Sequence, residues 1–238
     1  MDLKNAVVLV TGANRGLGFA FVQGLLAAGA RKVYAAAREP SDMPLHMLGD
    51  ARVLPLRLDV TSAADIAAAA AQCADVNLLI NNAGISRQAS FLAEGSTDAA
   101  RAEFETNFFG PLALSQAMAP ALAANGGGAI VNVLSVLSWL NLSGAATYSA
   151  SKSAAWSLTN GLRQELRGQR TQVLGLHVGF MDTDMTKGLQ APKADPADVV
   201  RQTLEALQAG AHELLADQLS RDVKSGLSAA QAPYLHAV

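Results

Sequence analysis

The chain has 238 residues, of which 50% are hydrophobic and 16% charged, and its formal net charge is −2 at neutral pH. Such a chain can bury a full core, while its charge supplies no basic stripe for a nucleic-acid backbone. The single cysteine, Cys73, excludes an intrachain disulfide, and no apolar run reaches the roughly 18 residues of a membrane span. We therefore expect one cytoplasmic domain over residues 1–238, with neither nucleic acid nor membrane as a partner.

Short β-branched runs alternate with longer alanine- and leucine-rich segments along the chain. The expected strands are residues 6–10, 32–37, 52–58, 76–80, 129–134 and 172–178, and the expected helices are 17–28, 62–74, 97–125, 148–168 and 196–209. Strands that are apolar on both sides indicate a parallel sheet covered by helices. The sequence thus predicts an α/β fold, a doubly wound parallel sheet with helices on both faces.

A glycine-rich turn, TGANRGLG, follows the first expected strand and contains Gly12, Gly16 and Gly18. Glycine permits positive φ and a close approach to a pyrophosphate, and the helix that follows offers unpaired N–H groups and its positive dipole end. The spacing differs from G-x-G-x-x-G, and such a turn can also be no more than a tight turn. Strand, glycines and amphipathic helix nevertheless follow the order of a dinucleotide site, so we expect a Rossmann-type sheet.

The residues after the second expected strand predict which dinucleotide binds. An acidic residue there would hydrogen-bond the ribose 2′-hydroxyl of NAD and repel the 2′-phosphate of NADP. The sequence instead reads VYAAAREP, with Arg38 at this place, and Arg15 in the glycine turn is a second guanidinium able to grip a phosphate. We expect NADP(H); Glu39 could weaken the preference, and the alternative for either arginine is a solvated surface charge.

Tyr148 and Lys152 stand four residues apart in TYSASKSAAWS and so share one face of an expected helix. A free phenol has a pKa of about 10, too high for a base at neutral pH. A cation about 4 Å away, at an effective dielectric of about 20, is worth roughly 4 kcal/mol and would lower that pKa by up to about three. We predict that Lys152 is this cation. The alternative is a packed tyrosine whose lysine reaches water.

These motifs together resemble the short-chain dehydrogenase/reductase family, in its compact, carbonyl-reductase-like branch, over about residues 4–185. The resemblance rests on TGANRGLG, Asp59 and Val60 in LDVT, NNAG at residues 81–84, Asn107 in NFFG, Ser135 in VNVLS, and Tyr148 with Lys152. It implies an NADP(H)-dependent oxidoreductase that transfers hydride between the nicotinamide and a small apolar ketone, aldehyde or secondary alcohol.

By this resemblance, the catalytic residues would be Asn107, Ser135, Tyr148 and Lys152. In reduction, Tyr148 would donate a proton to the carbonyl oxygen while Ser135 hydrogen-bonds that oxygen. Asn107 would hold a water that connects Lys152 to solvent. The alternative for Asn107 is a buried amide bonded to the backbone.

The family pattern also implies which residues bind the cofactor. They are Gly12, Asn14, Arg15, Gly16, Leu17, Gly18, Arg38, Asp59, Val60, Asn82, Ala83, Gly84, Tyr148, Lys152, Gly179 and Thr183. Asp59 and Val60 would border the adenine, and Thr183 would hold the nicotinamide carboxamide. Two positions depart from the pattern: Leu134 replaces a serine, and Val178 replaces a proline beside the expected nicotinamide loop.

Apolar residues border the expected substrate space, namely Trp139, Leu140, Leu142, Phe180, Met181, Met185 and Leu189. Such a border suits a neutral carbonyl compound better than a charged acid. The four histidines, His46, His177, His212 and His236, have no metal-ligand spacing, so no metal is expected.

The end of the chain lacks the glycine-rich terminal strand of many tetrameric family members, and a homodimer through the long helices or a monomer remains open. The competing functional hypothesis is a non-catalytic NADP(H)-binding sensor or signalling protein. The intact set of proposed catalytic residues favours the enzyme, because a pure binder needs no tuned proton donor.

Overall fold

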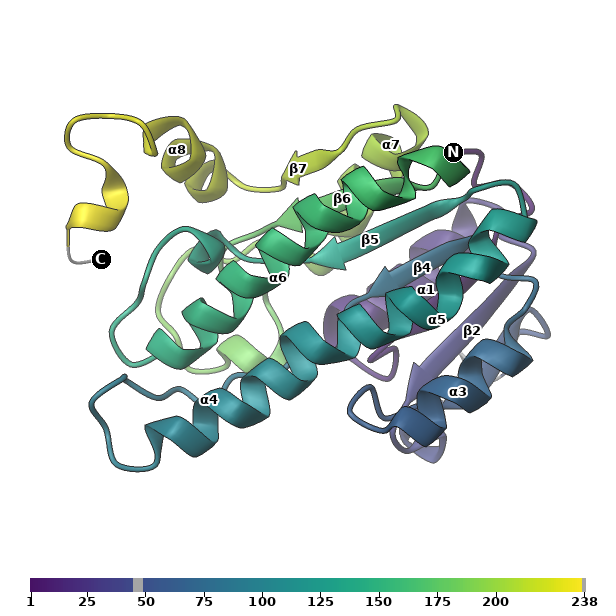
Figure 1. The fold of residues 1–238 in the computed structure, drawn as a ribbon, viewed down its shortest axis with the longest axis horizontal. Coiled ribbons are helices and arrows are strands. Elements are labelled where there is room, and N and C mark those ends of the chain that lie inside the picture. Colours follow the sequence, from purple (N-terminus) through teal and green to yellow (C-terminus); the bar gives the residue numbers. More distant parts are fainter. Residues whose placement is uncertain (45–48, 237–238) are drawn as a thin grey trace.

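A seven-stranded sheet forms the centre of the computed structural model, which describes residues 1–44 and 49–236 (Figure 1). The strands are β1 (Val7–Thr11), β2 (Lys32–Ala37), β3 (Val53–Arg57), β4 (Leu78–Asn81), β5 (Ala129–Val133), β6 (Gln172–His177) and β7 (Glu213–Leu215). Their order is β3-β2-β1-β4-β5-β6-β7, and every neighbouring pair is parallel. The strand order reverses between β1 and β4, which is where open α/β sheets bind ligands, outside the carboxyl ends of the strands.

Helices cover both faces of the sheet (Figure 1). One face carries α1 (Gly16–Ala27) and α7 (Pro196–Gln208); the other carries α3 (Ala63–Gln72), α5 (Gly110–Ala124) and α6 (Ala146–Glu165). Two further helices, α4 (Ser96–Phe104) and α8 (Gln218–Gly226), extend beyond these layers. Short 3-10 turns span Pro40–Asp42, Val136–Ser138, Leu166–Gln169, Asp184–Thr186 and Pro233–Leu235. No helix among the described residues has the length and apolar character needed to cross a bilayer.

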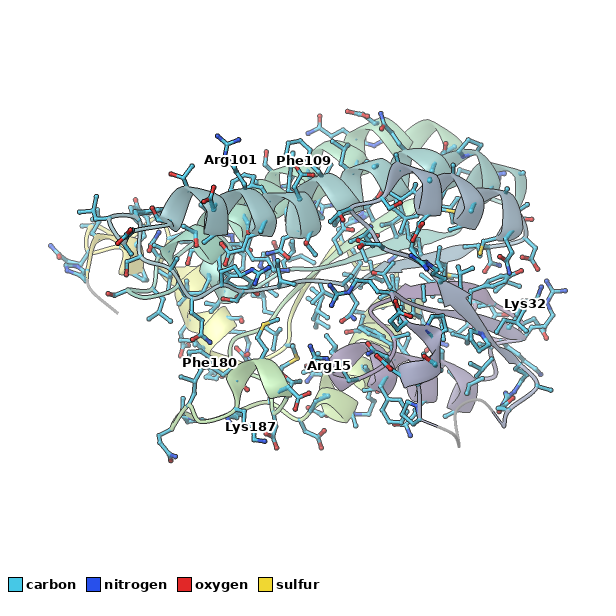
Figure 2. All side chains as sticks on the ribbon, turned by 90° about the horizontal axis from the view of Figure 1, so that it is seen from below. Arg15, Lys32, Arg101, Phe109, Phe180 and Lys187 are labelled. Carbon is cyan, nitrogen blue, oxygen red and sulfur yellow. The ribbon has the colours of Figure 1, made fainter. Side chains whose placement is uncertain are left out.

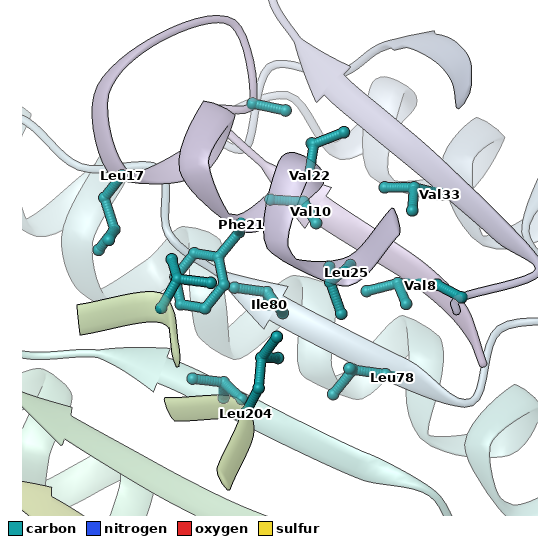
Figure 3. Close-up of a cluster of buried hydrophobic side chains, with 14 of the residues drawn as sticks. Val8, Val10, Leu17, Phe21, Val22, Leu25, Val33, Leu78, Ile80 and Leu204 are labelled. Atoms are coloured by element: carbon teal, nitrogen blue, oxygen red, sulfur yellow. The ribbon is translucent and has the colours of Figure 1, made fainter. Parts of the chain in front are cut away.

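Two hydrophobic cores lie on opposite sides of the sheet because successive side chains of a strand point to opposite faces. In β1, Val8 and Val10 belong to the core under α1 and α7, whereas Val7 and Leu9 belong to the core under α3, α5 and α6. In the first core Phe21 of α1, fully buried, packs with residues of the sheet and of α7 (Figure 3). Burying a side chain of this size stabilises the fold by about 1.5–3 kcal/mol. The prediction of strands that are apolar on both sides is confirmed, because each face of the sheet packs against its own hydrophobic core.

The helix predicted over residues 97–125 is interrupted. A π turn, Glu105–Phe109, separates α4 from α5. Pro111 has no N–H and cannot donate to the carbonyl of Asn107 four residues earlier, so one regular α-helical hydrogen bond is missing at this point. Single π turns inside helices occur frequently at functional sites. Here the turn contains Asn107, which is buried.

The expected elements include no strand after residue 178, and the structure adds one. β7 pairs with the carboxyl half of β6, and α8 follows it at the end of the molecule away from the N-terminus (Figure 1). The strand has only three residues, half-buried or exposed, which is too short for an alternating pattern to identify it.

Candidate active site

The glycine turn lies between β1 and α1 and leaves room for a ligand. Gly12 has φ +63°, a conformation that L side chains rarely adopt. A Cβ added to Gly18 would lie 2.1 Å from the carbonyl oxygen of Gly12, so helix and turn touch at backbone distance. Arg15, the N-cap of α1, makes no side-chain hydrogen bond to the first helical turn. Glycine backbone and uncapped N–H groups therefore form a cradle that fits a pyrophosphate.

Asn14, Gly16 and Leu17, the other residues of this turn expected to contact the cofactor, differ in whether their side chains can reach a ligand. Asn14 is half-buried in the turn, and Gly16 opens α1. Leu17 points into the core and is 5% exposed, so its side chain cannot contact a cofactor, which leaves only its backbone for that role.

Arg15 and Arg38 both lie at the surface. Arg38 is exposed directly after β2 and makes no ion pair with any residue that the structure describes. Arg15 instead pairs with Asp184 at 2.9 Å, and Figure 2 shows Arg15 beside the segment that carries Phe180 and Lys187. Both partners of this pair are mostly exposed, so it is worth at most about 1 kcal/mol and can be exchanged for a phosphate.

The NNAG segment ties β4 to the glycine turn. Asn82 Nδ2 donates to the carbonyls of Thr11 (2.8 Å) and Gly12 (3.2 Å), and the backbone N–H groups of Asn82 and Ala83 donate to Thr11 Oγ1. A Cβ on Gly84 would lie 3.2 Å from Asn107 Oδ1 and 3.7 Å from Lys152 Nζ. The segment thus connects the glycine turn with the surroundings of Lys152.

Asp59 and Val60 follow β3 at the carboxyl edge of the sheet. Asp59 Oδ1 accepts hydrogen bonds from the backbone N–H and the hydroxyl of Thr61, at 2.9 and 2.8 Å. Val60 is 8% exposed and packs against Gly110 at the start of α5.

Gly179 and Thr183 belong to the segment after β6. The Gly179 N–H donates to Asp217 Oδ2 at 2.5 Å, and Thr183 lies against Gly16, whose added Cβ would be 3.4 Å from Thr183 Cγ2. Val178, at the proline position of the family pattern, is buried, and its carbonyl accepts from the Val136 N–H. The substitution therefore leaves the loop anchored to both α8 and the Ser135 segment.

Ser135, Tyr148 and Lys152 converge where β5 ends. Ser135 lies two residues after Val133, the last residue of this strand, and its Oγ accepts from the Leu137 N–H at 3.1 Å. Tyr148 lies in the first turn of α6, and its phenol hydrogen-bonds the Ser135 side chain. Lys152 is 5% exposed, and its Nζ donates to the Val133 carbonyl at 2.9 Å. Tyr148 and Lys152 do share one helix face, as predicted, with Nζ 5.6 Å from the phenol ring centre.

Burial dominates the electrostatics of this pair. It raises the pKa of Tyr148, an effect partly offset by the hydrogen bond with Ser135 and reinforced by the charge of Glu103. Burial also lowers the pKa of Lys152 to about 8. The prediction that Lys152 lowers the pKa of Tyr148 is wrong for this structure, because the ammonium is directed to Val133 and desolvation of the phenol is the larger effect.

Asn107 is held by the backbone after β4. Its Oδ1 accepts from the Ile85 N–H, and its Nδ2 donates to the Ile85 carbonyl and to Ser151 Oγ, all at 2.9 Å. The Asn107 side chain is thus a buried amide that is hydrogen-bonded to the backbone, as in the alternative interpretation of this residue. A cavity of about 10 Å³, a volume for about one water, is lined by the polar side chains Asn81, Asn107, Asn132 and Lys152.

The expected substrate border is only partly available. Trp139 stacks on His177 with ring centres 3.9 Å apart, Lys224 of α8 lies over the Trp139 ring, and Leu140 is buried in the same cluster. Met185 and Leu189 are exposed on the segment after β6. Helix α8, which was not predicted from the sequence, thus packs against the cluster that contains Trp139 and Leu140, so these two side chains already have protein partners.

Three buried residues near the site were not predicted: Thr11, Ser151 and Glu103. Thr11 and Ser151 are small polar residues inside motifs, and only their hydrogen bonds identify them. Glu103 stands one helical turn before Asn107 among other charged residues, and no local pattern distinguishes it from a surface acid. Among residues 1–44 and 49–236, no group of three or more His, Cys, Asp or Glu side chains could hold a metal ion; His46 lies outside these ranges.

The sequence profile described as short chain dehydrogenase matches residues 6–194. The chain is 30% identical over 218 residues to 3-oxoacyl-(acyl-carrier-protein) reductase of Salmonella typhimurium, which covers 90% of this chain and 88% of that protein. The chain therefore belongs to the short-chain dehydrogenase/reductase family and is an oxidoreductase of that family.

Solved structures agree in fold. A short-chain dehydrogenase from Burkholderia cenocepacia in complex with NADP is 40% identical, with a TM-score of 0.91, and the match covers 97% of this chain and 96% of that one. NADPH-bound carbonyl reductase from chicken fatty liver is 32% identical, with a TM-score of 0.79, and the match covers 86% of this chain and 91% of that one. The predicted Rossmann-type, doubly wound sheet is confirmed.

Proposed function

We propose that this protein is an NADP(H)-dependent reductase of small, neutral ketones or aldehydes, with Tyr148 as the general acid. The observation that carries the proposal is the convergence of Ser135, Tyr148 and Lys152 at the carboxyl end of β5, on the sheet edge that also bears the glycine cradle. Proton donor, hydrogen-bond donor and buried cation are the groups that carbonyl reduction requires.

The cofactor assignment has two supports. The cradle of Gly12 and Gly18 with the first turn of α1 suits a pyrophosphate, and Arg38 with Arg15 suits a 2′-phosphate. The solved relatives from B. cenocepacia and chicken contain NADP and NADPH. Asp59 and Val60 would border the adenine, and Gly179 and Thr183 would lie along the nicotinamide. The bound nicotinamide would supply the hydride.

Tyr148 and Ser135 would act on the substrate oxygen. Because burial raises the pKa of Tyr148, the phenol stays protonated at neutral pH and can donate its proton as negative charge develops on the carbonyl oxygen. Ser135 Oγ accepts from the Leu137 N–H, and its hydroxyl hydrogen, which is shared with the Tyr148 phenol in this structure, would be donated to the substrate oxygen instead once substrate is bound. The hydroxyl would stabilise the developing charge until proton transfer is complete.

Lys152 would return a proton to Tyr148 after each turnover. Its pKa of about 8 lies close to neutrality, which suits a group that gives and takes protons. The cavity lined by Lys152 and Asn107 has the volume and polar lining for one water, which would link the ammonium to the surroundings. Asn107 would contribute by fixing the Ile85 backbone and by lining this cavity.

Replacing Arg38 with glutamine tests the cofactor assignment. We expect the dissociation constant for NADPH to rise by about 10- to 150-fold, because a charge-assisted hydrogen bond contributes about 1.5–3 kcal/mol, while the constant for NADH stays within about two-fold. Titration of both nucleotides by intrinsic fluorescence measures this. Arg101→Gln, which removes a charge from the outer side of α4, is the matched control (Figure 2). Equal weakening of both nucleotides, or tighter binding of NADH by the wild type, would contradict the assignment.

A screen of NADPH consumption tests the proposed activity. The panel would contain aliphatic, aryl and cyclic ketones, aldehydes and a 3-oxoacyl thioester, the last because of the Salmonella relative. Turnover of neutral ketones or aldehydes supports the proposal. NADPH binding without turnover of any carbonyl compound would favour the non-catalytic sensor instead.

A further inference from the structure

His177, the last residue of β6, places a polar ring inside the protein. The residue has no exposed surface. Its Nδ1 lies 3.2 Å from the carbonyl oxygen of Ser135, whereas Nε2 is buried and has no hydrogen-bond partner among the described residues. A buried polar atom without a partner destabilises a fold, and a leucine would fill this place in a buried strand at lower cost. Packing alone therefore does not explain a histidine at this position.

The contact with Ser135 determines which ring nitrogen carries the hydrogen. A carbonyl oxygen only accepts hydrogen bonds, so Nδ1 is the donor. Burial lowers the pKa of His177 to about 4. The bond to Ser135 and the charge of Glu213 partly offset this effect, and the nearby cations Lys224 and Arg163 reinforce it. The ring is therefore neutral at pH 7, with its hydrogen on Nδ1 and a lone pair on Nε2.

Most of the bonds that hold Ser135 come from its own turn. The Ser135 N–H donates to Ser138 Oγ at 3.3 Å, and the Ser135 carbonyl accepts from the Ser138 N–H at 3.0 Å. Its Oγ accepts from the Leu137 N–H. Bonds between such close neighbours shape the turn, but they do not fix its place relative to the sheet.

Strand β6 and the residue after it hold this turn against the sheet. The backbone N–H groups on either side of Ser135 donate to the carbonyls of Leu176 and Val178, at 2.8 and 3.0 Å. Between these two acceptors His177 contributes its side chain, which binds the carbonyl of Ser135 itself. The imidazole is thus the side chain of β6 that connects Ser135 directly to the sheet.

The imidazole ring is itself held in place. Trp139 stacks on it, with ring centres 3.9 Å apart and ring planes inclined by 18°. Lys224 of α8 lies over the Trp139 ring at 4.8 Å and pairs with Glu213 of β7 at 2.9 Å. Glu213 Oε1 lies 3.6 Å from Nε2, which is beyond hydrogen-bond distance. The stack fixes the plane of the ring, and with it the direction of the Nδ1–H bond.

We propose that His177 is a positioning residue: its Nδ1–H fixes the carbonyl of Ser135, and thereby the hydroxyl that would stabilise charge on the substrate oxygen. The inference rests on the proposed function, in which Ser135 binds that oxygen. His177 touches neither the substrate nor the cofactor in that proposal and acts through Ser135. A displacement of about 1 Å can slow a reaction about 100-fold, so a single hydrogen bond to the residue that presents the hydroxyl can change kcat.

Two variants separate the hydrogen bond of His177 from its packing. His177→Asn keeps an N–H donor at the place of Nδ1 but has no ring to stack on Trp139, whereas His177→Phe keeps a ring and has no donor. We expect kcat for carbonyl reduction to fall about 10-fold or more in His177→Phe and to stay within about three-fold of wild type in His177→Asn. KM for NADPH should stay within about two-fold in both variants.

His212→Asn, which replaces an exposed histidine, is the matched control and should have wild-type kcat. An active His177→Phe with an impaired His177→Asn would show that the ring serves packing, and it would refute the proposal. Equal kcat values in the two variants would refute it as well.

A second readout is independent of turnover. Ser135 and Val136 form the only Ser–Val pair in the sequence, so serine labelled with 13C at the carbonyl and valine labelled with 15N isolate the Ser135 carbonyl resonance. Its 13C shift should move in His177→Phe, which removes a hydrogen bond to this oxygen, and stay close to the wild-type value in His177→Asn. An unchanged shift in folded His177→Phe would contradict the contact.

The two proposals fail differently. If the wild type reduces no carbonyl compound, the proposed function fails, and the carbonyl resonance still decides whether His177 holds Ser135. If reduction proceeds and His177→Phe keeps its kcat, the role of His177 is refuted. If neither variant folds, 15N-labelled histidine in the wild type decides: one histidine must keep its hydrogen on Nδ1 without titrating between about pH 5 and 8, and a spectrum without it refutes the proposal.

Discussion

Replacing Tyr148 with phenylalanine is expected to lower kcat for carbonyl reduction by about 10²–10⁴-fold, because a positioned general acid contributes that much to a proton-transfer step. The change removes one oxygen from a ring in the first turn of α6 and leaves its packing intact. Affinity for NADPH should stay within a few-fold. Steady-state NADPH oxidation, together with a fluorescence titration of NADPH, measures the two effects separately.

Tyr234→Phe is the matched control for this variant. Tyr234 is 55% exposed in the turn after α8, far along the chain from the proposed site residues, and its replacement should leave kcat unchanged. Turnover of Tyr148→Phe within a few-fold of wild type would refute the mechanism. A parallel loss of NADPH binding would show instead that the phenol has a structural role in the cofactor site.

Lys152→Met should abolish most of the activity and yet stabilise the fold at pH 7. Burial lowers the pKa of Lys152 from 10.5 to about 8, so at neutral pH the folded protein carries a buried ammonium at a cost of about 3 kcal/mol. Methionine has a similar length and no charge, but it loses the charge-assisted hydrogen bond to the Val133 carbonyl, worth about 1.5–3 kcal/mol. We expect a net gain of up to about 1.5 kcal/mol in unfolding free energy and a loss of about 100-fold or more in kcat.

The stability difference between Lys152→Met and the wild type should depend on pH, and the lowered pKa of Lys152 gives the direction of that dependence. Below pH 8 Lys152 is charged in both the folded and the unfolded chain, and the full burial cost opposes folding. Between pH 8 and 10.5 the folded protein loses the proton first, so the cost declines as pH rises. Urea unfolding should therefore show the variant to be more stable than the wild type at pH 7, and this gain in stability should shrink at pH 10. Lys187→Met, at an exposed lysine, should show no such gap; a gap that widens with pH would contradict the buried-ammonium interpretation.

Much of the fold follows from local pattern. Strands such as β1, with apolar residues on both sides, can be stable only inside a sheet with two covered faces, and the structure has a core on each face. Strand β7 escaped prediction because three residues carry too little pattern. The π turn escaped because its cause, the missing N–H of Pro111, acts on a neighbour four residues away.

For the candidate site, too, some features were predictable from the sequence and others were not. Gly12, Ser135, Tyr148 and Lys152 were found from their order along the chain, and the structure brings them to one edge of the sheet. Their electrostatics could not be found in that way. The direction of the pKa change at Tyr148 depends on how deeply the phenol is buried, and this is a sum over neighbours from several elements.

Contacts between distant segments were equally hidden. Arg15 meets Asp184 across 169 positions, and Trp139 meets Lys224 of α8, so one expected phosphate ligand and one expected substrate contact each have another partner. Neither pairing leaves a trace in the local sequence around any of these residues.

The sequence by itself determined the parallel α/β sheet and the glycine turn, and it predicted which residues would carry out the acid–base chemistry, because periodicity and motif order are properties of neighbouring positions along the chain. The tertiary structure decided which charges are buried, where Lys152 and Arg15 direct their cations, and that Glu103 accepts a hydrogen bond from the Arg87 backbone. Desolvation and Coulomb energies depend on distances through space, and only the folded chain sets those distances.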